Sequence, residues 1–108
     1  MSALEETLMQ QIRWAKLPAP KREYRAVPGR RYRWDLAWPD HMLLVEVQGG
    51  IWGKGGHSSG TGIERDTEKL ALAILRGWRV LQVTTRQIRD GRALAWIQAA
   101  LAADTQER

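Results

Sequence analysis

The 108-residue sequence contains no cysteine and no phenylalanine, and it has only two histidines and four prolines. The lack of cysteine excludes disulfides and thiolate metal sites. No apolar run approaches the roughly 18 residues of a membrane span, and the first residues lack the apolar stretch of a signal peptide. We therefore expect a soluble, cytoplasmic protein with a single domain over residues 1–108. Its 44% hydrophobic content is enough for one core.

Positive charge is the main compositional bias that remains. The sequence has seventeen lysines and arginines and twelve acidic residues, which leaves a net charge of +5. Such an excess favours an anionic partner, and nucleic acid is the commonest one. A basic surface that only maintains solubility is the alternative at this point.

The order of periodic segments predicts an α/β fold. Apolar residues at helical spacing indicate a helix over residues 2–17, where Ser2 and Glu5 match a capping box and proline follows. Strands are expected at 22–27, 30–38, 42–48 and 78–84. Further helices are expected at 63–76, ended by Gly77, and at 86–103, interrupted near Asp90 and Gly91. The helix between the third and fourth strands indicates a parallel pair, and thus a mixed β-sheet flanked by helices in the order α-β-β-β-α-β-α.

The alternation of side chains in two of these segments predicts their faces. Tyr32, Trp34, Leu36 and Trp38 should share one face of the second strand. In the helix over 63–76 the expected inner face consists of Ile63, Thr67, Leu70 and Ile74.

A glutamate, Glu46, interrupts the apolar run of the third strand, and such a charge is costly unless it is compensated. Pro39 favours a four-residue turn over 39–42, which places Trp38 opposite Leu43 and Asp35 opposite Glu46. The two carboxylates then lie roughly 5 Å apart on one face of the sheet. A shared divalent cation such as Mg²⁺ would explain the pair.

Two other uses of nearby acids are weighed against this metal site. Asp35 or Glu46 can instead pair with Arg31, Arg33 or a lysine on a helix. Asp40 lies in the turn, where its side chain has a local hydrogen-bonding role, so it is left out of the site.

At these residues the sequence resembles the PD-(D/E)XK nuclease superfamily, and most of all its small endonuclease-domain and Holliday-junction-resolvase-like branches, found in phages and bacteria. Asp35 matches the first acid of the motif, Glu46 the second, and Gln48 the position of the lysine. The resemblance implies a restriction-endonuclease-like fold and a DNA endonuclease that uses Mg²⁺, with Mn²⁺ as a substitute. It also implies that the Val47 carbonyl is a further metal ligand and that Glu5, on the first helix, joins the site.

Gln48 departs from that pattern, because a neutral amide can position water but supplies no charge. Lys69 or Lys54 could provide the missing positive charge. Glu64 is a further candidate for support of the site, by analogy. The departure keeps open a second interpretation, in which the chain is a DNA-binding module that has lost catalysis.

The remaining candidates are contacts with DNA. Arg30, Arg31 and Arg33 precede or lie on the strand of Asp35 and could grip flanking phosphates. The glycine-rich segment 49–62 holds His57, which could assist a proton transfer, and Trp52, which could stack on a base. That segment does not match a Walker A motif. A homodimer would supply the two sites needed to cut both strands, although no sequence feature demonstrates it.

Overall fold

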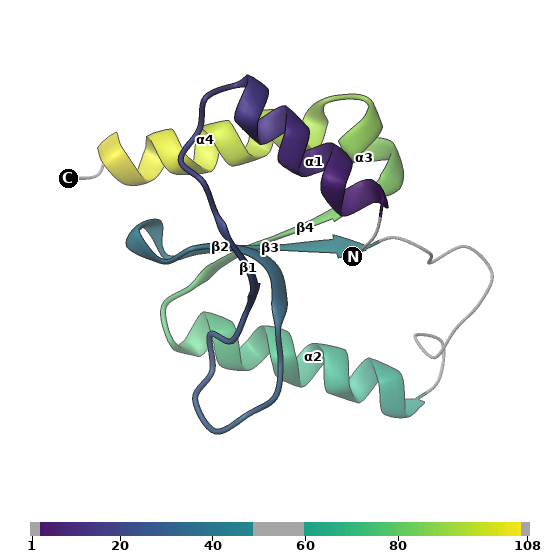
Figure 1. The fold of residues 1–108 in the computed structure, drawn as a ribbon. Helices are drawn as coiled ribbons and strands as arrows, with labels where there is room; N and C mark the ends of the chain where they lie inside the picture. The colour runs from purple at the N-terminus through teal and green to yellow at the C-terminus, as the bar shows by residue number, and fades with distance from the viewer. Residues whose placement is uncertain (1–2, 49–59, 107–108) are drawn as a thin grey trace.

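A computed structural model describes residues 3–48 and 60–106. The elements follow the expected order, with a short 3₁₀ helix in the turn and the last helix divided in two (Figure 1). Their bounds are α1 Ala3–Trp14, β1 Lys21–Tyr24, β2 Trp34–Trp38, η1 Pro39–His41, β3 Leu43–Gln48, α2 Gly60–Leu75, β4 Arg79–Thr84, α3 Thr85–Arg89 and α4 Arg92–Gln106.

One four-stranded sheet, in the order β1-β2-β3-β4, forms the centre of the molecule. β1, β2 and β3 pair antiparallel, and β4 pairs parallel to β3. The predicted mixed sheet and its parallel pair are therefore confirmed. The four-residue turn is confirmed as well, because Trp38 pairs with Leu43.

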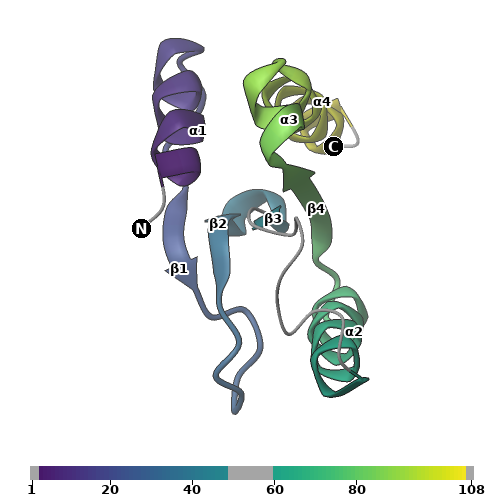
Figure 2. The same cartoon turned by 90° about the vertical axis from the view of Figure 1, so that its right-hand side faces the viewer.

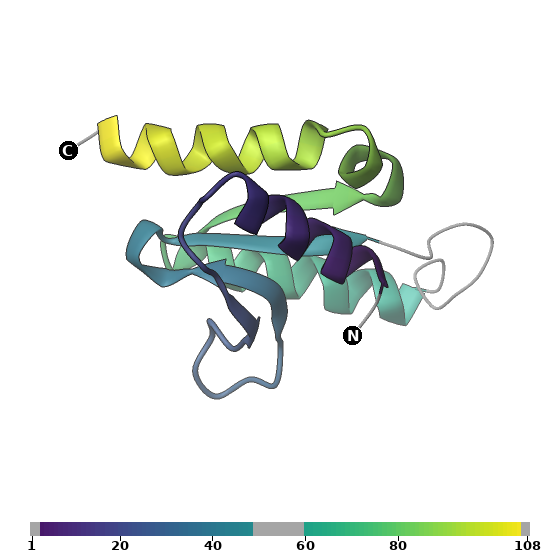
Figure 3. The same ribbon diagram turned by 45° about the horizontal axis from the view of Figure 1, so that its top comes forward.

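The sheet separates two apolar cores. Helices α1, α3 and α4 lie on one side and α2 on the other (Figures 1 and 3). The first core contains Leu8, Ile12 and Ile97 against Leu36 and Val45. The second contains the side chains of Ala26, Val27, Trp34, Ala37, Leu44, Ala73 and Trp78. Burial on both faces explains why β3 reads as a nearly continuous apolar run.

Two predicted faces are wrong. Trp34 packs in the second core, while Leu36 and Trp38 pack in the first. Three of the four residues predicted for the inner face of α2 are also wrong, since Ile63 and Ile74 are about half exposed and Thr67 is exposed. The helix instead turns Gly62, Leu70 and Ala73 inward, together with the side chain of Lys69.

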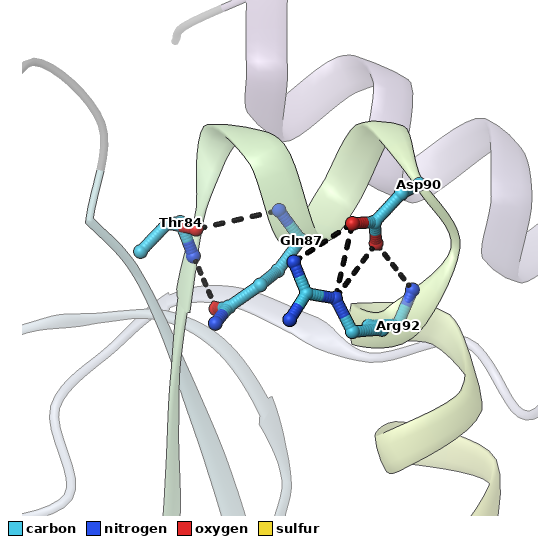
Figure 4. Close-up of polar contacts among 4 residues, drawn as sticks. All are labelled: Thr84, Gln87, Asp90 and Arg92. Carbon is cyan, nitrogen blue, oxygen red and sulfur yellow. Dashed lines mark hydrogen bonds and ion pairs between the residues drawn. The ribbon is translucent and has the colours of Figure 1, made fainter.

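The end of α2 and both ends of α3 are set by individual residues. Gly77 follows α2 with a φ of +94°, a conformation that costs glycine little. Thr84 caps α3 through a reciprocal pair of hydrogen bonds with Gln87, and Asp90 accepts from Arg92 at the break before α4 (Figure 4). None of the described helices is both long enough and apolar enough to cross a membrane.

Leu44 offers a direct test of the second core. Its side chain is fully buried, whereas Leu75 at the end of α2 is 80% exposed. We expect Leu44→Ala to lower the free energy of unfolding by about 2–5 kcal/mol, because it removes buried contacts and leaves a cavity. Leu75→Ala is the matched control and should change it by about 0.5 kcal/mol or less. Urea unfolding of both variants measures the difference, and equal losses would contradict the two-core description.

Candidate active site and metal centre

Three acidic residues form one row across the sheet. Arg22 pairs with Leu36, so the next position places Glu23 beside Asp35. Leu36 pairs with Val45, so the same step places Glu46 on the other side of Asp35. The row lies where β1 and β3 end and β2 begins.

Glu5 on α1 adds a fourth carboxylate to this end of the sheet. Its side chain is buried, and one oxygen from each of Glu5, Glu23 and Asp35 lies within 4.8 Å of the other two. These three residues are called the acidic trio below. Carboxylate oxygens are hard ligands of the kind that Mg²⁺ and Mn²⁺ accept. The donor set therefore fits a hard divalent cation.

Arg22 holds Glu5 in this position. Its guanidinium donates from Nε and Nη2 to Oε2 of Glu5, at 3.1 and 2.9 Å. The other terminal nitrogen, Nη1, lies 2.9 Å from Oε2 of Glu6. The arginine thus ties the start of α1 to the edge strand β1. It also places a positive charge beside the acidic trio, where it lowers the pKa of Asp35 slightly against larger effects that raise it.

The backbone of Glu23 has an unusual conformation. Its φ of +50° lies in the left-handed region, which a residue other than glycine seldom adopts inside a strand. Such strained positions tend to occur at functional sites. Here the conformation coincides with the residue that completes the acidic trio.

Asp35 is held by the main chain of β3. Its Oδ2 accepts a hydrogen bond of 2.7 Å from the N–H of Val47. Burial raises the pKa of Asp35, the Val47 hydrogen bond opposes this, and the negative charge of Glu23 adds to the rise. A carboxylate whose ionised form is disfavoured in this way would gain from a nearby cation.

Glu46 forms the second part of the site, on the side of α2. Its Oε2 accepts a hydrogen bond of 2.9 Å from Nζ of Lys69, which also lies 4.8 Å from the ring centre of Trp34. Oε1 is buried and has no hydrogen-bond partner among the described residues. Burial raises the pKa of Glu46, Lys69 lowers it, and the charge of Asp35 raises it further.

A small cavity adjoins the Glu46–Lys69 pair. Its volume of about 20 Å³ is room for one water molecule or one small ion. The lining residues are Trp34, Glu46, Gln48, Asp66, Lys69, Leu70 and Gln82. Gln48 therefore shares this space with a lysine that comes from a helix.

A comparison with solved structures gives one match. The chain aligns with the catalytic domain of the homing endonuclease I-Bth0305I at a TM-score of 0.71, over 96% of this chain and 98% of that domain, with 14% sequence identity. The chain has an endonuclease-like fold. No protein-family model matches the sequence, and neither does any curated protein.

The endonuclease-like fold gathers some of the predicted residues and separates others. The β2–β3 register, continued one position past Leu36 and Val45, sets Asp35 next to Glu46, but the acidic trio joins Asp35 to Glu5 and Glu23 and does not include Glu46. The expected two-acid pair is thus an incomplete description. Lys69, one of two lysines considered as a substitute for the motif lysine, contacts Glu46 directly.

Other predicted residues lie outside these contacts or outside the described chain. Glu64 is exposed at the fifth residue of α2 and does not line the cavity. Arg30 is paired with Glu68. His57, Lys54, Trp52 and Ser2, with the capping box proposed for Ser2, lie outside the described residues. The role of the Val47 carbonyl stays a prediction.

Glu23 and Arg22 were missed in the sequence. The signal that could have found Glu23 is the register of β1, because the pairing of Lys21 with Ala37 puts Glu23 opposite Asp35. Arg22 alternates with Glu23 in a short charged strand, which reads as a solvated edge. Neither residue belongs to an apolar pattern, so periodicity gave no reason to select them.

The raised pKa of Asp35 predicts how stability depends on pH. When the pKa of an acid is higher in the folded than in the unfolded protein, the acid does not destabilise the fold at low pH, where it is protonated in both states. The free energy of unfolding then falls as pH rises through the folded pKa, because the acid must ionise in the folded protein. Asp35→Asn keeps an oxygen for the Val47 N–H and removes the charge. Without divalent cations, we expect the variant and parent to be equally stable near pH 3.5 and the variant to be more stable at pH 7. Urea unfolding of both proteins between pH 3.5 and pH 7 measures the two free energies of unfolding. A parent that is more stable than Asp35→Asn at pH 7 would contradict the prediction.

Proposed function

We propose that the chain is a DNA endonuclease that hydrolyses phosphodiester bonds with the help of Mg²⁺ or Mn²⁺. The observation that carries the proposal is the gathering of Glu5, Glu23 and Asp35 beside the Glu46–Lys69 pair. The endonuclease-like fold supports it, since the matched domain is the catalytic domain of a homing endonuclease. The net charge of +5 suits a polyanionic substrate.

In this proposal Glu5, Glu23 and Asp35 hold the cation, with Glu46 at the adjoining register position. A bound divalent cation would acidify water and reduce the negative charge of the scissile phosphate. Arg22 keeps Glu5 in place through its two contacts. These residues come from α1, β1 and β2, so the site depends on the assembled sheet.

Lys69 supplies the charge that Gln48 lacks. Its ammonium is fixed by Glu46 and by the face of Trp34, so it is positioned before a substrate arrives. The Gln48 amide lines the same cavity and can orient a water molecule. Glu46, with one oxygen engaged by Lys69, can accept a hydrogen bond from that water through the other.

The second candidate function is a DNA-binding module without catalysis. The substitution of Gln48 for the expected lysine favours it. In that case the acidic trio would bind divalent cations without any cut in the DNA. Branched or four-way-junction DNA as the preferred substrate, and a homodimer that cuts both strands, are finer versions of the nuclease proposal.

The deciding experiment is incubation with end-labelled linear duplex, flap and four-way-junction DNA, with Mg²⁺, with Mn²⁺ and with EDTA. Cleavage that requires the divalent cation supports the nuclease proposal, and the preferred DNA form identifies the substrate class. The parallel measurement is the melting temperature with and without divalent cation, which reports binding at the acidic trio. DNA binding without cleavage of any form would support the second candidate.

A further inference from the structure

The segment between β1 and β2, residues 25–33, is here called the arginine arm. It contains Arg25, Arg30, Arg31 and Arg33 and no acidic residue. It extends from the end of the sheet that holds the acidic row and runs beside α2 (Figure 2). Ala26 and Val27 anchor it, because both are buried in the second core.

Glu68 on α2 fixes the other half of the arm. Its two carboxylate oxygens accept from the two terminal nitrogens of Arg30, each at 3.3 Å. The Tyr32 hydroxyl donates to the same carboxylate. The Tyr32 hydrogen bond, and then Arg30, hold the pKa of Glu68 below its usual range, so the carboxylate stays ionised near neutral pH. Two arm residues thus converge on one acid.

The remaining charges of the arm have no partner in the part of the chain that the structure describes. Arg25, Arg31 and Arg33 are exposed, and no described residue pairs with them. Arg33 precedes Asp35 by two residues, which corresponds to roughly 7 Å of chain. The six residue-to-residue steps from Gly29 to Asp35 reach at most about 20 Å, or about 6 base pairs along a duplex at 3.4 Å each.

We propose that the arginine arm is a preorganised contact surface for the phosphates beside the cleavage site, and that Glu68 is a positioning residue that sets it. The inference rests on the proposed function for its partner, DNA. Glu68 carries a negative charge, which by itself would repel DNA. Its contribution is to fix the arm, so that fewer conformations are lost when the arginines meet phosphate.

Two opposed expectations make Glu68→Gln informative. Simple charge accounting says that removal of a carboxylate strengthens DNA binding. The positioning role says that binding weakens by about 3- to 10-fold, because Arg30 loses its ionic partner and must share one neutral amide oxygen with Tyr32 as acceptor. Asp40→Asn is the matched control, since it removes an exposed carboxylate from η1, at the opposite end of β2 from Asp35. Binding is measured by fluorescence anisotropy on duplex DNA with EDTA, so that no cleavage occurs.

Tyr32→Phe provides a second variant in which no charge changes. We expect it to weaken binding about 2- to 5-fold by the loss of one hydrogen bond to Glu68. Tyr24→Phe is its control, because the Tyr24 hydroxyl makes no hydrogen bond within the described residues. Circular dichroism and melting temperature confirm that all four variants are folded.

The readout that a merely structural role would not change is the pattern of phosphate contacts. Ethylation interference on the parent should mark phosphates on one side of the cut, within about 6 base pairs, and Arg31→Ala with Arg33→Ala should remove those marks and flatten the salt dependence of binding. Glu68→Gln that binds as tightly as Asp40→Asn would overturn the inference. A parent that binds DNA but never cuts would overturn the proposed function alone, whereas a parent that binds no DNA would overturn both.

Discussion

Asp35→Asn should abolish detectable cleavage while the protein remains folded. The substitution removes one carboxylate from the acidic trio and keeps an oxygen for the Val47 N–H. The two remaining carboxylates would hold a divalent cation weakly, since charge count and ligand number set affinity. We expect the single-turnover cleavage rate to fall by more than about 10⁴-fold.

The control for this prediction is cation binding in the same variant. In the parent, Mg²⁺ or Mn²⁺ should raise the melting temperature, because it binds the folded state. In Asp35→Asn the shift should be lost, and DNA affinity with EDTA should be equal to or higher than that of the parent. Cleavage at the parental rate by the folded variant would show that the acidic trio is not the metal centre.

Glu46→Gln and Lys69→Met should each lower the cleavage rate by about 10²–10⁴-fold. The ammonium of Lys69 is 2.9 Å from Oε2 of Glu46, so either change leaves the other residue without its charged partner. Because the two residues act as one unit, the double variant should be little worse than the single variants. Losses that multiply would mean that the residues act independently.

Variants of Gln48 test the positioning of water separately from the supply of positive charge. Gln48→Ala should be milder than Glu46→Gln, because Lys69 already provides the positive charge in the cavity. Gln48→Lys should be tolerated, since it restores the commoner residue of the nuclease motif. Single-turnover rates of these variants, with circular dichroism as the folding check, provide the comparison. If Gln48→Ala is as slow as Lys69→Met, the assignment of charge to Lys69 is wrong.

The hairpin register was predictable because local turn chemistry determines it. Pro39 favoured the four-residue turn, and the structure pairs Trp38 with Leu43 as that turn requires. Side-chain faces were less predictable. Residues two apart in a regular strand share a face, but Trp34 is the first residue of β2 and packs in the second core, while Leu36 and Trp38 pack in the first.

Only part of the site was predictable from the sequence. On α2, the residue that matters is a lysine turned inward toward Glu46, while Ile63 and Ile74 are exposed, so the apolar stripe pointed to the wrong face. Glu5 entered the prediction through a resemblance, and Glu23 did not enter at all. A contact between a helix start and a short edge strand depends on tertiary packing, which no local pattern contains.

The left-handed backbone of Glu23 also affects how the molecule behaves toward its own copies. β1 is an edge strand, and within the described chain nothing pairs with its outer side. A flat edge would invite a strand from another molecule, but a residue at φ +50° interrupts the regular row of donors and acceptors. The strand is also only four residues long and carries Lys21, Arg22 and Glu23. The backbone conformation of Glu23 therefore also opposes edge-to-edge pairing of the sheet with another copy.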